Sequence, residues 1–401
     1  MTFDFGNEAI SVKKPSHVLI LNEIRKHSSI TKADLVEKFD LTSAAIGKIV
    51  SELISSNIVQ EIGYGMSQGG RPPVLYAMHW ESAFVIAIDI GVKTVSVAAI
   101  DLKGEAKEKI SAPVKNNSVI QLVYDLVDTL LDQVTLNAVG IGVSAPGPIN
   151  PVSGTILTPP NLSGAKNLKI TELLEIRYDL PTILEVDANA SALAEQWFGS
   201  SKESVDTLFV YNDQGLGGSV IIDSRVYKGM GNSAGEIGHM SIDIDGPKCS
   251  CGNFGCLETL GSGMAIEQYI KAGIRRGAIT PLESLYSAGE EIALSEIAKH
   301  AYQGDSLAKQ AFEEAGRYLG IGVANAVNLF APDLVVFGGH VSALYPKMIQ
   351  IAERVAKKRS FSPMANNIPF ARAEFNKDSN LIGAAAVIQQ KIFDYPEGIL
   401  M

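Results

Sequence analysis

All three cysteines of this 401-residue chain lie within eight positions, in the stretch KCSCGNFGC. The number is odd and the chain is long, so a disulfide framework is an unsuitable explanation for Cys249, Cys251 and Cys256. In a reducing compartment, clustered cysteines are more often metal ligands or catalytic groups than disulfide partners. The loop is therefore expected to gather its thiols around one centre.

The first ten residues, MTFDFGNEAI, lack the basic region and apolar run of a signal peptide. Apolar runs such as AFVIAIDI are far shorter than the roughly 20 residues that cross a bilayer. We therefore expect a cytoplasmic protein with no membrane segment. The net charge of −10 argues against general coating of nucleic acid, but residues 1–80 carry eight basic and eight acidic residues and can still present a basic face.

Three short helices are predicted between Pro15 and residue 56. The first has an apolar stripe formed by Val18, Leu21 and Ile24. Thr31 and Asp34 have the spacing of a capping box for the second, whose apolar face is Leu35, Val36 and Phe39. Thr42 can cap a third, with Ala45, Ile46, Ile49, Leu53 and Ile54 facing inward. Short helices with tight connections are typical of a helix-turn-helix.

Two strand-like runs, VQEIGYG and PPVLYAM, follow the third helix and are separated by MSQGGR, as in a two-stranded wing. In a winged helix-turn-helix, the third helix enters the major groove of DNA. Its outward residues would contact bases or phosphates: Ser43, Ala44, Gly47 and Lys48. Arg71, after Gly69-Gly70, suits a narrow minor groove. The alternative is a helical module that binds protein, with Arg71 solvated.

From residue 84 onward the pattern changes to strands, glycines and alternating helices. FVIAIDIG and TVSVAAIDLKGE predict two strands, followed by a third strand, a helix over about 118–134 and the strand AVGIGVSA. TLFVYNDQGLGGSVIID and DLVVFGGHVS repeat this pattern later. We expect two α/β lobes with a cleft between them, and Asp89, Ser144 and Asp187 at the carboxyl ends of strands.

Several motifs in chain order give a resemblance to a known family. They are the winged helix, DIG at 89–91, GVSAPGPI, PPNLSG, EVDANASALAE, EIGHM, CSCGNFGCLE, FGGHVS and NLIGAAA. Together they resemble the ROK family (repressor, ORF, kinase), and within it the Mlc/NagC group of sugar-responsive repressors. The resemblance covers nearly the whole chain from about residue 15.

The resemblance implies an α/β fold in which a winged helix-turn-helix precedes a two-lobed, actin-like, hexokinase-type (ribonuclease H-like) ROK domain. The winged helix would occupy residues 1–80 and the first lobe residues 84–190. The second lobe, with the metal loop, would occupy 191–380, and a C-terminal helix over 381–395 would return to the first lobe. The short connection around 78–84 suggests direct coupling between head and lobes.

The resemblance also supplies a fourth ligand for the cysteine loop. Zinc prefers four soft or borderline ligands in a tetrahedron, and the family motif adds His239 to Cys249, Cys251 and Cys256. Such a closed site would be structural, because no coordination position remains for water or substrate. The alternative is a chance cluster of buried thiols beside a core histidine.

The same loop would hold sugar-binding groups. In the family, residues matching Asp187, Glu236, His239 and Glu258 contact the sugar, and the residue matching Asn161 can help. Carboxylates accept hydrogen bonds from vicinal hydroxyls, while His239 could bind metal with one ring nitrogen and a hydroxyl with the other. Alternatively, the acids are solvated or only orient the metal ligands.

Two phosphate loops of the family's kinases are altered here. Asp187 matches their general base, but Val92 adds bulk to the first loop and Asp213 would put a negative charge beside ATP in the second. Val186 stands where a polar residue, commonly Asn, precedes the aspartate, which would weaken sugar binding or change the ligand. We therefore expect a sensor without kinase activity.

The resulting prediction is a repressor of genes for sugar uptake or metabolism that binds operator DNA as a homodimer or homotetramer. Its effector would be a sugar or sugar phosphate, or a phosphotransferase-system protein as in Mlc-type repressors. The alternatives are a ROK-type, ATP-dependent sugar kinase and a zinc-stabilised adaptor that binds protein.

Overall fold

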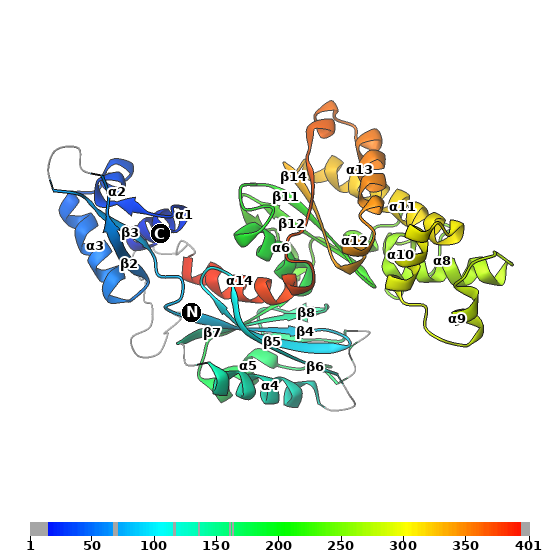
Figure 1. Cartoon of the computed structure of the whole chain (residues 1–401), viewed down its shortest axis with the longest axis horizontal. Coiled ribbons are helices and arrows are strands. Elements are labelled where there is room, and N and C mark those ends of the chain that lie inside the picture. The colour runs from blue at the N-terminus through cyan, green and yellow to red at the C-terminus, as the bar shows by residue number, and fades with distance from the viewer. Residues whose placement is uncertain are drawn as a thin grey trace. The chain divides into compact units, whose positions relative to one another are not determined.

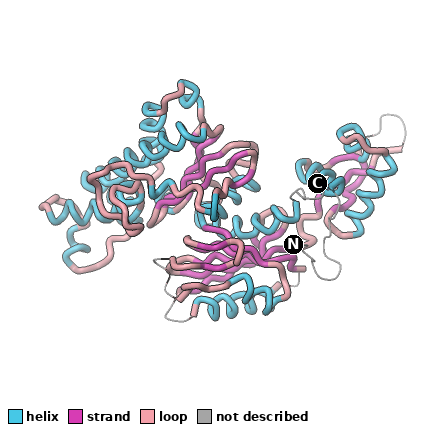
Figure 2. Tube along the Cα trace, turned by 180° about the vertical axis from the view of Figure 1, so that it is seen from behind, coloured by secondary structure: helices cyan, strands magenta, loops and turns pink. Residues whose placement is uncertain are grey.

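The structure is a computed structural model, and it describes residues 15–66, 71–114, 118–134, 137–159, 162 and 164–393. The chain divides into two compact units. One runs to Val186 and takes up the chain again at Ala384, and the other is Asp187–Gly383. Figure 2 shows that both units combine strands with helices.

The first unit begins with a winged helix-turn-helix (Figure 1). Its elements are α1 (Pro15–Lys26), β1 (Ile30–Thr31), α2 (Lys32–Lys38), α3 (Ser43–Ser55), β2 (Val59–Tyr64) and β3 (Val74–Met78). The three strands form an antiparallel sheet in the order β1-β3-β2, in which β2 and β3 are the wing. The short strand β1 was not predicted, because two residues carry no alternation of apolar and polar side chains.

Local hydrogen bonds begin the second and third helices of this head as the sequence predicts. The Thr31 hydroxyl accepts from the Asp34 backbone N–H, and the Asp34 carboxylate accepts from the Thr31 backbone N–H in return. The Thr42 hydroxyl accepts from the Ala45 N–H at 3.2 Å. The buried side chains of α3 are Ile46, Ile49, Val50 and Leu53, so Val50 joins the predicted face. Ala45 and Ile54 are only half-buried.

The rest of the first unit is an α/β lobe around a five-stranded mixed sheet of order β10-β7-β4-β5-β6. Its elements are β4 (Phe84–Ile90), β5 (Thr94–Asp101), β6 (Ala106–Pro113), α4 (Val119–Gln133), β7 (Ala138–Ala145), β8 (Ile149–Asn150), β9 (Thr155–Ile156), α5 (Ile170–Tyr178), β10 (Thr182–Val186) and the part of α14 (Ser379–Phe393) from Ala384. Figure 1 shows α4 and α5 on one face of this sheet and α14 on the other.

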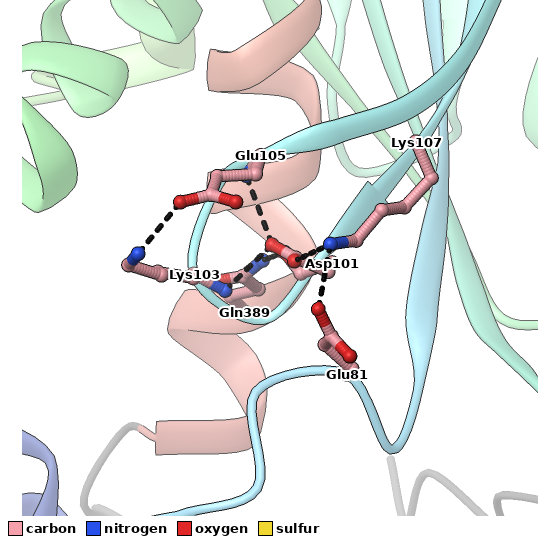
Figure 3. Close-up of polar contacts among 6 residues, drawn as sticks. All are labelled: Glu81, Asp101, Lys103, Glu105, Lys107 and Gln389. Atoms are coloured by element: carbon pink, nitrogen blue, oxygen red, sulfur yellow. Dashed lines mark hydrogen bonds and ion pairs between the residues drawn. The ribbon is translucent and has the colours of Figure 1, made fainter.

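A network of polar contacts ties the β5–β6 turn to its surroundings (Figure 3). The buried Asp101 carboxylate accepts from the backbone N–H groups of Lys103 and Glu105 at 3.0 and 2.9 Å. The Lys107 ammonium lies 3.1 Å from Asp101 and 3.0 Å from Glu81. The Gln389 side chain of α14 donates to the Asp101 carbonyl at 2.8 Å. The network therefore joins the segment after the wing to the lobe and its last helix.

The second unit is also built on a five-stranded sheet, of order β13-β12-β11-β14-β15. Its strands are β11 (Thr207–Asn212), β12 (Leu216–Ile222), β13 (Arg225–Val226), β14 (Leu334–Gly338) and β15 (Phe370–Arg372). Its helices are α6 (Asp187–Phe198), α7 (Glu258–Gly261), α8 (Gly263–Arg275), α9 (Glu283–Ser287), α10 (Leu294–Gln303), α11 (Ser306–Phe330), α12 (His340–Leu344) and α13 (Lys347–Arg359). Its short 3₁₀ helices are η1 (Met230–Asn232), η2 (Ile237–His239), η3 (Pro363–Asn367) and η4 (Asn376–Asp378).

The two sheets share one topology. In each, three consecutive antiparallel strands are extended by two parallel strands on the side of the first: β4 by β7 and β10, and β11 by β14 and β15. This repeated unit confirms the predicted actin-like fold behind a winged helix-turn-helix. In the described part of the chain, no helix is both long and apolar enough to span a bilayer.

Candidate functional site

The cysteine loop brings four candidate metal ligands together. One ligand atom from each of His239, Cys249, Cys251 and Cys256 lies within 4.8 Å of all the others. The Cys251 and Cys256 sulfurs are 3.7 Å apart, and the Cys249 sulfur lies 3.7 Å from His239 Nδ1. These four side chains could hold a metal ion.

The backbone of the loop is closed by short hydrogen bonds around its glycines. The Cys249 N–H donates to the Asn253 carbonyl at 2.8 Å, and the Gly255 N–H donates to the Pro247 carbonyl at 2.8 Å. Gly255 has a φ of +62°, and a Cβ atom there would lie 1.5 Å from the Asp243 carbonyl oxygen. Glycine is therefore required at this position, because both its backbone conformation and its contact exclude a side chain.

The thiol of Cys256 is held in its neutral form in the absence of a cation. Burial is the largest cause that raises the pKa of Cys256, to about 12, and the neighbouring thiols of Cys251 and Cys249 raise it further. A bound divalent cation would reverse this balance, because it stabilises the thiolate directly.

The turn that carries Glu236 and His239 is positioned by strand β12. Glu236 precedes η2, and the His239 N–H donates to the Glu236 carbonyl at 3.1 Å. A Cβ atom at Gly238 would lie 1.8 Å from the Leu216 carbonyl oxygen, so the turn packs directly on the strand backbone. His239 Nδ1 faces Cys249, which leaves Nε2 as the ring nitrogen that can serve another partner.

Glu258 connects the metal loop to the β11–β12 hairpin. It is the first residue of α7, and its Oε2 accepts from the Leu216 backbone N–H at 3.1 Å. Its Oε1 lies 3.9 Å from the Cys249 sulfur. No local pattern predicts the contact with Leu216, because it joins segments 42 positions apart. Glu258 therefore orients the loop whatever else it binds.

The structure brings Asp187, Glu236, His239 and Glu258 into electrostatic contact. Asp187 is the first residue of α6, directly after β10, and burial raises its pKa to about 6, with Glu236 and Asp213 adding to the effect. Glu236 has an exposed side chain, and its pKa is raised chiefly by partial loss of water, opposed by His239 and increased by Glu258. The neighbouring carboxyl groups of Asp187, Glu236 and Glu258 favour ligands that donate hydrogen bonds.

The two segments predicted to correspond to kinase phosphate loops lie at strand ends. Val92 follows β4 and has 45% of its side chain exposed. Asp213 lies in the turn between β11 and β12, where its carboxylate accepts from the Gln214 N–H at 2.9 Å and its carbonyl accepts from the Gly263 N–H at 2.8 Å. The aspartate is thus built into the hairpin turn.

The predicted DNA-contacting residues lie on the exposed side of α3 and beside the wing. Ser43, Ala44 and Lys48 are exposed, and Gly47 is half-buried. Arg71 is exposed, while its neighbours Gly69 and Gly70 lie outside the described residues. Asn161, the remaining predicted sugar ligand, also lies outside the described residues.

The fold is that of a winged helix-turn-helix protein with an actin-like domain, and comparison with known proteins identifies its family. The model of the ROK family matches residues 85–391, and the chain belongs to that family. It is 31% identical to the xylose repressor of Caldicellulosiruptor bescii over 402 aligned residues, which cover 98% of this chain and 99% of that protein.

Solved structures extend the likeness. A ROK family transcriptional regulator described as a homologue of the Escherichia coli Mlc protein matches with a TM-score of 0.82 and 27% identity, covering 95% of this chain and 97% of its own. A ROK hexokinase from Thermus thermophilus matches with a TM-score of 0.63 and 28% identity. It covers 77% of this chain and 99% of its own. The similarity to repressors therefore extends over more of this chain than the similarity to this kinase.

Proposed function

We propose that this chain is a DNA-binding transcriptional repressor of sugar uptake or metabolism genes, controlled by a sugar or sugar phosphate. The observation that carries the proposal is a winged helix-turn-helix in front of a ROK domain, in a chain similar to a xylose repressor over 98% of its length. The head supplies the DNA-binding element, and the second unit supplies a group of carboxylates suited to hydroxyl ligands.

In this proposal α3 enters the major groove of the operator. Its exposed residues Ser43, Ala44 and Lys48 contact bases or phosphates, and Arg71 inserts into the neighbouring minor groove. A homodimer or homotetramer presents two such heads to two half-sites, whose spacing matches that of the heads. The proposed head is residues 1–80, the first lobe 84–190 with a helix over 381–395, and the second lobe 191–380, whereas the two compact units divide after Val186 and after Gly383.

The metal is zinc, held by His239, Cys249, Cys251 and Cys256. With Zn–S and Zn–N bonds of about 2.3 and 2.0 Å, a tetrahedral site has edges of about 3.8 Å between sulfurs and about 3.5 Å from sulfur to nitrogen. The observed 3.7 Å separations of Cys251 from Cys256, and of Cys249 from His239 Nδ1, fit two opposite edges of this tetrahedron. Zinc bound there would supply rigidity, because four protein ligands leave no open position.

The sugar binds beside this loop. Asp187, Glu236 and Glu258 accept its hydroxyl protons and His239 Nε2 completes the set, with Asn161 as a further ligand. Binding shifts the equilibrium toward a state whose heads no longer match the operator spacing, by the difference in sugar affinity between the two states. A phosphotransferase-system protein is the second candidate for the signal, acting on the same equilibrium in the cytoplasm.

A ROK-type sugar kinase is the alternative function, and one observation favours it. A carboxyl group whose pKa is about 6, such as that of Asp187, suits a general base. Val92 and Asp213 weigh against it, because bulk and negative charge would stand where ATP phosphates must approach. The kinase predicts ATP turnover on a panel of hexoses and pentoses that disappears in Asp187→Asn, and the repressor predicts no turnover.

Selection of bound fragments from random-sequence DNA, at near-physiological salt, tests the proposal. The repressor predicts enrichment of a palindromic site, and Arg71→Ala should bind that site at least about tenfold more weakly. Failure of the full chain to enrich any sequence would refute DNA binding and favour an adaptor that binds protein. A site bound equally well by Arg71→Ala would refute only the minor-groove contact.

A further inference from the structure

A cavity lies beside two packed helices of the second unit, α11 and α13. Helices α11 and α13 pack closely there, since a Cβ atom at Gly320 would lie 2.6 Å from the Ala352 carbonyl oxygen. Beside this contact is a cavity of about 440 Å³, lined by residues of both helices and by Tyr345. The volume falls within the range of roughly 300–1,000 Å³ that is typical of small-molecule sites.

The rim of this cavity is positively charged, although the chain as a whole carries a net charge of −10. Arg317, Lys347 and Arg354 line it together with a single acid, Glu313. Arg317 also bonds Glu314 at 2.8 Å, and Lys347 lies over the Tyr302 ring at 5.7 Å. Among the described residues, no carboxylate lies within ion-pair distance of Arg354. Its guanidinium can therefore engage a ligand.

The lining residue Tyr345 is buried and packed against the core of the second unit. Tyr345 is only 4% exposed, and its ring stacks on Phe312 with a centroid separation of 4.4 Å. Burial raises the pKa of Tyr345, and Tyr302 and Glu313 raise it further, so the phenol stays neutral. Tyr345 and the exposed Gln350 add uncharged polar groups to the lining, and Glu313 adds an acceptor for hydroxyl protons.

We propose that this cavity binds a phosphorylated, hydroxyl-bearing small molecule of the size of a monosaccharide phosphate. Arg354, with Arg317 and Lys347, would hold the phosphate, because guanidinium groups match phosphate oxygens in a forked geometry. Glu313 and Gln350 would take the hydroxyls. The site shares no residue with the group around Asp187, and its occupancy does not depend on the proposed DNA binding.

Isothermal titration calorimetry of the full chain tests the site with D-ribose 5-phosphate, D-ribose and inorganic phosphate. The proposal predicts that ribose 5-phosphate binds more tightly than inorganic phosphate. In Arg354→Gln its affinity should fall about tenfold to a hundredfold, since a charged hydrogen-bond donor is lost. Arg359→Gln removes the same charge from the exposed end of α13 and should bind like the wild type.

Any of four results would overturn the proposal. Equal affinity of Arg354→Gln and wild type would remove the cavity as the site. Loss of binding in Asp187→Asn together with normal binding in Arg354→Gln would move the ligand to the carboxylate group. Binding of inorganic phosphate as tight as that of ribose 5-phosphate, or no binding of either at millimolar concentration, would exclude recognition of the sugar.

Discussion

The ammonium group of Lys32 lies directly over Gly47, so that a Cβ atom at Gly47 would be 2.8 Å from Lys32 Nζ and 3.3 Å from its Cε. Lys32 is the first residue of α2, and Gly47 lies on the proposed recognition helix α3. In the described part of the chain, Lys32 has no carboxylate at ion-pair distance. The missing side chain of Gly47 thus makes room for a cation beside Lys48.

Replacing Gly47 by alanine should have opposite effects on stability and on DNA binding. The free energy of unfolding of the head should rise by about 0.5–1 kcal/mol, because alanine favours a helix. Operator affinity should fall by about three- to tenfold, because Lys32 is displaced. The slope of log affinity against log salt concentration should decrease in magnitude by about 1, which corresponds to the loss of one phosphate contact. Thermal unfolding and fluorescence anisotropy in a salt series measure the two effects.

Two lysines of α2, Lys32 and Lys38, supply the controls. Lys32→Gln should reproduce the loss of affinity and of salt dependence without the gain in stability. Lys38→Gln removes an ammonium that already bonds Glu23 at 2.7 Å, so the salt slope should not change. Wild-type affinity in Gly47→Ala would show that Lys32 takes no part in DNA binding.

Loss of one thiol should empty the metal site. Cys256→Ser removes a buried ligand, so the metal content should fall from one equivalent per chain to near zero, with a drop in Tm on the order of 5 °C. Elemental analysis and calorimetry measure both quantities. Ser250→Ala changes an exposed residue between two ligands and should keep its metal. Full metal content in Cys256→Ser would contradict the proposed ligand set.

The raised pKa of Asp187 should make stability depend on pH. Its folded-state pKa of about 6 exceeds the ordinary pKa of 3.8. Its contribution to the free energy of unfolding is therefore fully present below about pH 4 and is lost as pH rises through 6. Asp187→Asn should therefore gain stability relative to wild type between pH 4 and 7, on the order of 2 kcal/mol. Denaturation in sugar-free buffer measures the difference. Asp132→Asn, at an exposed position of α4, is the control. If the stability difference between Asp187→Asn and wild type did not change with pH, the raised pKa of Asp187 would be refuted.

The network around Asp101 should stabilise the first unit. Asp101→Ala leaves two backbone N–H groups and the Lys107 ammonium without this partner, and should cost about 2–4 kcal/mol in the free energy of unfolding. Glu81→Gln removes only an exposed ion pair and should cost less than about 1 kcal/mol. Urea denaturation distinguishes the two variants, and equal costs would show that Asp101 has no special role.

Local signals in the sequence predicted most of the fold. Hydrogen-bonding side chains such as Thr31 and Thr42 begin helices through contacts three residues away, so their effect is visible in spacing alone. The cysteine loop was predictable for the same reason, because three of its four candidate ligands lie within eight positions. Apolar alternation and glycine-rich turns predicted the two α/β lobes.

Long-range packing was not predictable in this way. The contact of Glu258 with the Leu216 N–H, the approach of Lys32 to Gly47, and the cavity between α11 and α13 each join segments that local periodicity does not relate. The burial that raises the pKa of Asp187 likewise comes from tertiary structure. The sequence shows which side chains are present, but the tertiary structure determines which of them are in contact.

The affinity of the full chain for its selected operator, measured with and without a panel of sugars and sugar phosphates, tests the central claim most directly. We predict that one of these compounds weakens operator binding at least about tenfold and that Glu236→Gln loses this response while still binding DNA. Operator affinity unchanged by every compound would contradict control by a sugar and would turn the search to a protein signal.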